Sequence, residues 1–322
     1  MISKHPFPEL QLPAVAAPMF LISGPNLVVE CCKSGIVGSF PALNQRTSEG
    51  FEQWLIDIKN QLDEFEQQNG IKVPPFAVNL IMHPSNTRMQ TDLELCIKHQ
   101  VPLIITSLGI VPSAIEAIHA YGGRVFHDVI NRRHAEKAAA AGVDGLILVS
   151  AGAGGHAGTI NPIALISEIR SFFDKTILLS GCISNGRDIA SAMQMGADLA
   201  YMGTRFINTT ESLAPEDYRT MIIDSGASDI VYTAAVSGVN ANFMRKSLEE
   251  NGITQEVWDH KGKMDFDDET SEATAWKTIW SAGQGVNSIT DVLPTAELIA
   301  RIKKEFHLAI QQQAELLNHY PE

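Results

Sequence analysis

The sequence predicts an α/β protein, a TIM-type (β/α)8 barrel with a helical insertion after the eighth strand. Eight short apolar runs alternate with longer amphipathic segments over the first two thirds of the chain. Strands that alternate with helices of this length form right-handed βαβ units and a parallel sheet. Eight such units favour closure into a barrel over an open sheet, and 322 residues are enough for one barrel-sized domain.

The predicted strands are short apolar runs that stop at glycine or polar residues. They cover residues 14–17, 36–39, 76–80, 103–106, 125–128, 146–149, 176–179 and 199–202. Helical patterns lie between them at residues 51–68, 87–99, 113–120, 131–141, 162–173 and 186–195. A last helix, residues 295–317, would close the barrel.

The alternation of strands and helices stops after the eighth strand, which suggests where the chain divides. We expect residues 1–207 and 281–322 to form the barrel, and residues 208–280 to form an inserted helical lid segment. The insertion is not expected to be an independent domain, because the chain then returns to the segment Trp280-Ser281-Ala-Gly283. No low-complexity linker appears in the sequence.

Charge and composition point to a small-molecule partner. The net charge of -13, from 24 basic and 37 acidic residues, argues against binding to nucleic acid or to an anionic membrane surface. No run approaches the roughly 18 apolar residues of a membrane-spanning helix, and the start of the chain has no signal-peptide core. The four cysteines have no metal-ligand spacing, so no metal is expected. These features predict a soluble, cytoplasmic protein.

The loop after the sixth predicted strand holds the strongest candidate for catalysis. In it His156 is surrounded by four glycines, Gly152, Gly154, Gly155 and Gly158. Glycines let a planar or anionic ligand lie against the backbone, and TIM-barrel active sites lie at the carboxyl ends of the strands. Residues 152–157 also match a dinucleotide-binding pattern, but no helix opens at once and no acidic residue ends the next strand. A purely structural loop histidine is the alternative to a catalytic one.

The loops after the seventh and eighth strands predict an anion site. Ser180, Gly181 and Cys182 follow one strand, and Gly203 and Thr204 follow the other. In TIM barrels these positions often hold a phosphate on backbone N–H groups. Ordinary tight packing between strand and helix is the alternative.

As an ordered set, the motifs at the strand ends resemble the nitronate monooxygenase family, formerly called 2-nitropropane dioxygenases. The motifs are Ala17-Pro-Met19, Phe76-Ala-Val-Asn79-Leu, Ala153-Gly-Gly-His156-Ala-Gly158, Ser180-Gly, Gly196-Ala-Asp198, Gly203-Thr-Arg-Phe206 and Trp280-Ser-Ala-Gly283-Gln-Gly285. The resemblance implies an FMN-containing TIM barrel without a metal. It also implies oxidation of alkyl nitronates, and of the parent nitroalkanes, by O2 to a carbonyl compound and nitrite.

The resemblance also assigns roles to individual residues. His156 matches the catalytic histidine, and Ser281 matches a serine near the substrate. The expected FMN contacts, together with neighbours in the same strand-end loops, are Ala17, Pro18, Met19, Asn79, His127, Gly154, Gly155, Ser180, Gly181, Cys182, Gly203 and Thr204. Three positions depart from the family pattern. Gly152-Ala153 stands where an acidic residue is common, Asp128 where some members have a positive residue, and Cys182 where glycine is common.

Two roles for His156 and three classes of function stay open at this point. The ring could act as a neutral base on the Cα proton of a nitroalkane, or as a cation or donor that holds an anionic nitronate. The alternative to nitronate oxidation is an NAD(P)H-dependent FMN reductase on the same fold, similar to enoyl-acyl carrier protein reductase II or an NADH:quinone reductase. The third class is a non-enzymatic flavin- or phosphate-binding protein. The expected partners are a small-molecule substrate and O2, and we also consider a homodimer.

Overall fold

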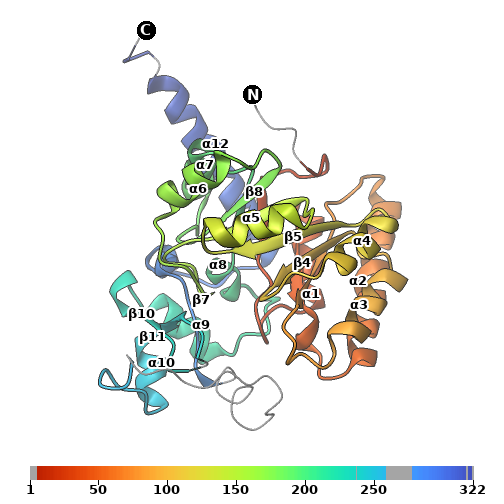
Figure 1. Cartoon of the computed structure of the whole chain (residues 1–322). Coiled ribbons are helices and arrows are strands. Elements are labelled where there is room, and N and C mark those ends of the chain that lie inside the picture. The colour runs from red at the N-terminus through yellow and green to blue at the C-terminus, as the bar shows by residue number, and fades with distance from the viewer. Residues whose placement is uncertain (1–5, 237, 259–277, 317, 321–322) are drawn as a thin grey trace.

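The computed structural model describes residues 6–236, 238–258, 278–316 and 318–320 (Figure 1). In this part of the chain eight parallel strands form one sheet in the order β1-β9-β8-β6-β5-β4-β3-β2. The strands are β1 Ala14–Ala16, β2 Ser39–Pro41, β3 Ala77–Ile81, β4 Leu103–Ser107, β5 Arg124–Val129, β6 Gly145–Val149, β8 Thr176–Ser180 and β9 Leu199–Met202.

The sheet closes into a barrel through backbone hydrogen bonds between its two end strands. The N–H of Ala16 donates to the carbonyl of Val37 over 2.8 Å, and the N–H of Val37 donates to the carbonyl of Ala14 over 3.2 Å. These bonds confirm the predicted TIM-type fold. Because Val37 pairs with β1 and the chain then turns to pair with β3, β2 begins three residues later than the predicted start at residue 36.

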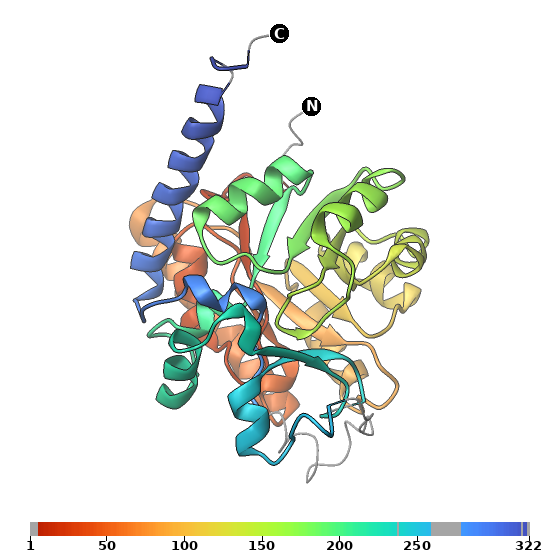
Figure 2. The ribbon, with the colours of Figure 1, turned by 90° about the vertical axis from the view of Figure 1, so that its left-hand side faces the viewer.

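Helices cover the outside of the barrel, as the alternating pattern predicts. They are α1 Pro25–Lys33, α2 Ser48–Asn69, α3 Met89–Lys98, α4 Pro112–Ala120, α5 Arg132–Ala140, α6 Pro162–Arg170, α7 Gly186–Met195, the short α8 Thr204–Ile207 and α12 Thr295–Leu316. Local signals fix their ends. For example, Asn185 and Asp188 form a capping box at the start of α7, and Gly196 ends this helix with φ of 110°. Helix α12 packs on α7 and α1, and its second half extends beyond the barrel (Figure 2).

The core has two layers, which follow the alternation of side chains along each strand. Side chains inside the barrel include Val15, Leu103, Phe126 and Leu199, all fully shielded from water. Their sequence neighbours point outward and pack against the helices. At one end of the barrel Phe7 packs against Phe126, with 6.2 Å between ring centroids.

The predicted insertion contains helices, as expected, and also two strands that the sequence pattern does not reveal. Its elements include α9 Glu216–Ile223, β10 Ile230–Thr233, β11 Ala241–Met244 and α10 Arg245–Glu250. Strands β10 and β11 form an antiparallel sheet with β7, Gly155–His156, which belongs to the loop after β6 (Figure 1). Residues 259–277 of the predicted insertion lie outside the described residues. Among the described helices, none has the length and apolar character needed to cross a membrane.

Candidate active site

Strand β11 brings the two predicted catalytic residues to the same edge of the small sheet. His156 pairs with Ala241, and Ser281 forms an antiparallel bridge with Phe243. Ala241 and Phe243 are two residues apart on one strand, so the backbones of His156 and Ser281 lie about 7 Å apart along this edge. Residues paired directly across antiparallel strands project to the same face. The insertion therefore assembles the pair, which come from distant parts of the barrel sequence.

Side chains of the insertion also bind the loop around His156. The buried amide of Asn242 donates from Nδ2 to the carbonyl of Ala153 over 2.6 Å. The hydroxyl of Tyr232 donates to the carbonyl of Ala157 over 3.0 Å. These two carbonyls flank the segment Gly154–His156, which is thereby held on both sides.

The surroundings of His156 keep its ring neutral. Burial lowers the pKa of this imidazole to about 4, and no described charged group adds to the shift. At neutral pH the ring is uncharged and able to accept a proton. This favours the role of neutral base over the role of cation.

Backbone contact explains two of the glycine motifs together. A Cβ on Gly154 would lie 2.8 Å from the nitrogen of Gly283, and a Cβ on Gly283 would lie 2.7 Å from the carbonyl oxygen of Gly152. The N–H of Gly283 donates to Thr204 Oγ1 over 2.9 Å, and the N–H of Gln284 donates to the carbonyl of Gly152 over 2.9 Å. Such close approach of two chain segments requires glycine. The segment after the insertion is thus fixed against the His156 loop.

The loop after β8 has two residues with positive φ whose N–H groups could bind an anion. Gly181 has φ of 125°, and a Cβ there would overlap Ser150 Oγ and lie 3.0 Å from the carbonyl oxygen of Ala151. Cys182 adopts a left-handed φ of 57°. Neither N–H donates a hydrogen bond to any described residue. Successive free N–H groups in such a turn form a concave anion-binding site.

The loops after β9 and β1 meet beside this turn. A Cβ on Gly203 would be in ordinary contact with Ala17 Cβ at 3.7 Å and with Met19 Cγ at 3.8 Å. Thr204 lies between Gly154 and Gly283, because its Oγ1 is 3.2 Å from a Cβ built on Gly154. Loops from four strand ends therefore converge on one mouth of the barrel.

The Met19 loop owes its shape to Asn44, a residue that the sequence analysis missed. Asn44 Nδ2 donates to the carbonyls of Met19 and Ser23 over 3.0 and 2.8 Å, and Asn44 Oδ1 accepts from the N–H of Leu21 over 2.8 Å. Leu21 has a left-handed φ of 60°, which costs a leucine free energy unless neighbours hold it there. No local sequence pattern identifies Asn44, because its partners lie more than 20 positions away.

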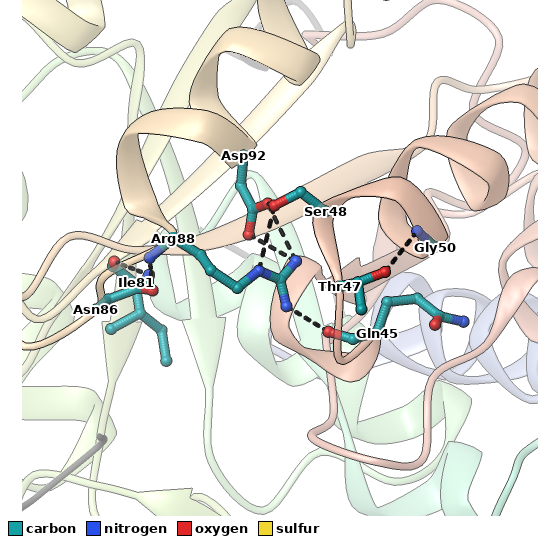
Figure 3. A network of polar contacts seen from close by, with 8 residues as sticks. All are labelled: Gln45, Thr47, Ser48, Gly50, Ile81, Asn86, Arg88 and Asp92. Carbon is teal, nitrogen blue, oxygen red and sulfur yellow. Dashed lines mark hydrogen bonds and ion pairs between the residues drawn. The ribbon is translucent and has the colours of Figure 1, made fainter. Parts of the chain in front are cut away.

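An arginine connects the loop after β2 with the loop after β3 (Figure 3). Arg88 donates from Nη1 to the carbonyl of Gln45 and from Nη2 to Asp92 Oδ1, the second over 3.0 Å. Asp92 is 1% exposed and also accepts from the hydroxyl of Ser48 over 2.8 Å. Because Gln45 follows Asn44, this network supports the residue that shapes the Met19 loop.

A polar chain lines the inside of the barrel on three neighbouring strands. Asn79 Nδ2 donates to Ser107 Oγ over 2.8 Å, and the hydroxyl of Ser107 donates to Asp128 Oδ2 over 2.7 Å. Asp128 Oδ1 is buried and has no hydrogen-bond partner among the described residues. Burial raises the pKa of this carboxyl to about 6, although the bond from Ser107 opposes the shift. Asn79 therefore lies inside the barrel, bonded to Ser107, and neither Ser107 nor Asp128 was in the predicted set.

His127 is not brought to this group, which weighs against its expected contact with the cofactor. On β5 the neighbouring Phe126 packs inside the barrel, whereas Val125 and Val129 face the helices. Alternation places His127 on the helix side, where its Nδ1 lies 2.7 Å from Thr106 Oγ1. Burial lowers the pKa of His127 to about 4, with smaller contributions from His134 and Lys137.

Several residues at the mouth could hold a planar group with a terminal phosphate. Gly154 is exposed, and the space where Gly155 would carry a Cβ is open to 4 Å. The N–H groups of Gly181 and Cys182, which donate to no described residue, could donate to a phosphate. The other predicted contacts, Pro18, Met19, Ser180, Gly203 and Thr204, are partly exposed, and Ala17 is buried. Among the described residues, no group of three or more His, Cys, Asp or Glu side chains is arranged to hold a metal ion.

Comparison with known proteins agrees with this geometry. The model of the nitronate monooxygenase family matches residues 42–305. A nitronate monooxygenase of Paraburkholderia phytofirmans is 24% identical, and the alignment covers 97% of each chain. The solved nitroalkane oxidase of Streptomyces ansochromogenes superposes with a TM-score of 0.80 at 22% identity, covering 95% of this chain and 98% of the other. The structure of FabK from Thermotoga maritima gives a TM-score of 0.78 at 20% identity, covering 96% of each chain. The family model spans far more than half of the sequence, and the chain therefore belongs to the nitronate monooxygenase family of oxidoreductases.

Proposed function

We propose that this protein binds FMN and oxidises alkyl nitronates, and the parent nitroalkanes, with O2 to a carbonyl compound and nitrite. The observation that carries the proposal is the common edge of β11, where a neutral histidine and a serine lie together above a mouth lined with glycine. Membership of the family supports the reaction class.

The residues that would hold the cofactor come from the converging loops. The N–H groups of Gly181 and Cys182 would bind the phosphate, and Gly203 and Thr204 would complete that end. Met19, Asn79, Gly154 and Gly155 would border the planar part. When bound, the flavin would accept electrons from the substrate and pass them to O2.

Two side chains would act on the substrate. A ring nitrogen of His156 would accept the Cα proton of a neutral nitroalkane, which the low pKa of about 4 permits because the ring is neutral at neutral pH and one of its two nitrogens carries no proton. The hydroxyl of Ser281 would donate to a nitro oxygen. Ser281 is itself held by the hydroxyl of Tyr218, which donates to its backbone carbonyl.

The first test identifies the cofactor and the substrate class. Mass spectrometry of the ligand released on denaturation should find FMN; FAD would contradict the proposed cofactor. Anaerobic mixing with propionate-3-nitronate should bleach the flavin absorbance, and admission of O2 should restore it. Bleaching by NADH or NADPH, without bleaching by the nitronate, would instead establish the reductase alternative.

The second test separates proton removal from the later steps. His156→Asn should keep flavin content and melting temperature, while turnover of neutral nitroalkane falls by about 10²- to 10⁴-fold, the usual effect of losing a general base. Preformed nitronate already lacks the proton, so its turnover should fall less. His134→Asn, an exposed histidine on α5, is the matched control and should change neither rate. Undiminished turnover of both substrates in His156→Asn would show that the loop is only a structural turn.

A further inference from the structure

The loop after β6 is held by two different parts of the protein. At its base the N–H of Gly158 donates to the carbonyl of Val149, the last residue of β6, over 3.1 Å, and the N–H of Ala151 closes the loop by donating to the carbonyl of Ile160 over 2.9 Å. Its tip, residues 153–157, is bonded to the insertion through β11, Asn242 and Tyr232. His156 belongs to the tip.

The tip has little means of fixing its own shape. Gly154 and Gly155 have no side chains to pack, and Gly155 adopts a positive φ of 68° with open space around the position of a Cβ. Glycine residues leave the unfolded and loop states with wide conformational freedom. The position of His156 must therefore be imposed by hydrogen bonds from outside the loop.

Of the two side-chain bonds to the tip, the one from Asn242 is the better shielded from water. Asn242 is 3% exposed, whereas Tyr232 is 39% exposed. A buried carbonyl that loses its donor is costly, because no water replaces the bond. Asn242 also pairs through its backbone with Gly155, next to His156, so one residue fixes both the backbone register and the Ala153 carbonyl.

We infer that Asn242 is a positioning residue for His156, and that the insertion sets the geometry of the catalytic loop rather than only covering the mouth. This inference rests on the catalytic role proposed for His156. The positioning of His156 can be tested apart from that catalytic role, because the placement and shielding of the ring can be measured without turnover.

The experiment compares two asparagines of the insertion. Asn242→Ala removes the bond to Ala153. Asn251→Ala is the matched control, since Asn251 Nδ2 also donates to backbone carbonyls, those of Ser247 and Thr278, over 2.8 and 3.1 Å, but does not touch the loop. The readout is the titration of His156 by NMR on ¹⁵N-histidine-labelled protein, with His156→Asn to assign its signal.

We expect Asn242→Ala to raise the pKa of His156 from about 4 toward the ordinary value of 6.5, because the loosened tip admits water to the ring. The kcat for a neutral nitroalkane should fall about tenfold or more with little change in KM or FMN content, as expected when a reacting group is misplaced. Asn251→Ala should leave the titration unchanged. If Asn242→Ala does not fold, Tyr232→Phe, which removes a partly exposed hydroxyl, should shift the titration in the same direction by a smaller amount.

Two results would overturn the inference. One is an unchanged His156 titration in Asn242→Ala, or in Tyr232→Phe where only that variant folds. The other is an equal shift in Asn251→Ala, which would mean that any loosening of the insertion has this effect. A shifted titration with undiminished turnover would support the positioning of His156 while contradicting its catalytic role, so the two failures are distinguishable.

Discussion

A pair of glycine substitutions, one in the loop after β6 and one in the loop after β8, tests why glycine is required at the mouth. Gly155 and Gly181 both have positive φ, at 68° and 125°, but only Gly181 would place a Cβ against other atoms. Gly155→Ala should therefore lose about 1 kcal/mol of unfolding free energy, the usual cost of a left-handed alanine. Gly181→Ala should lose about 4 kcal/mol of unfolding free energy. A backbone conformation that alanine rarely adopts contributes about 1 to 3 kcal/mol, and overpacking of the new Cβ contributes about 1 to 3 kcal/mol.

The assay is urea unfolding, with the midpoint compared at constant m-value. The contact that Gly181→Ala creates first is with Ser150 Oγ, so the double variant with Ser150→Ala should recover part of the loss beyond additivity. The single Ser150→Ala variant loses a bond to the carbonyl of Ser180 and serves as the reference. Equal losses in Gly155→Ala and Gly181→Ala, or strict additivity with Ser150→Ala, would refute the steric account of Gly181.

Three further predictions concern other residues of the mouth. Burial raises the pKa of Asp128 to about 6, so the folded protein is stabilised by the neutral carboxyl below pH 4 and loses this stabilisation as the pH rises through 6. In the ligand-free protein, Asp128→Asn should therefore increase the free energy of unfolding by up to about 3 kcal/mol at pH 8 and leave it unchanged at pH 4. Urea unfolding at the two pH values measures this difference. Asn44→Ala should destabilise the fold by about 2 to 3 kcal/mol and weaken FMN binding, because three hydrogen bonds that shape the Met19 loop are lost. An unchanged FMN affinity would contradict the proposed contact of the Met19 loop with the cofactor. Cys182→Gly should raise the melting temperature slightly, because a left-handed cysteine costs about 1 to 2 kcal/mol whereas glycine adopts this conformation freely. A lower melting temperature would show that the lost contact between Cys182 Sγ and the carbonyl of Gly152 outweighs the relief of backbone strain.

The barrel strands could be predicted from sequence because each is a short apolar run between polar or glycine-rich segments. Helix α1 was missed, since its run Leu27–Val29 resembles a strand and only Pro25 at the first turn marks a helix. Strands β10 and β11 were missed for another reason. Each has four residues, and the partner that completes their sheet is a two-residue stretch of a distant loop.

The candidate site shows a similar division. The glycine loops and His156 could be found because glycine marks close approach at a strand end. Ser281 was identified by resemblance alone, since nothing local indicates that β11 joins it to His156. His127 was expected to contact the cofactor, but the structure places its side chain beside Thr106 on the helix side. The sequence does not reveal this side, because apolar residues occur on both faces of β5, with Val125 and Val129 on one and Phe126 on the other.

The pairing of β7 with β11 also has a consequence for how the protein is made. The barrel strands through β9 are complete by residue 202, but the partner of β7 begins only at residue 241. At ordinary rates of translation the loop with His156 therefore emerges on the order of ten seconds before its partner strand. During that interval the nascent barrel can pair its eight strands while the catalytic loop stays open. A chain that stops before residue 241 would accordingly contain every barrel strand and no assembled site.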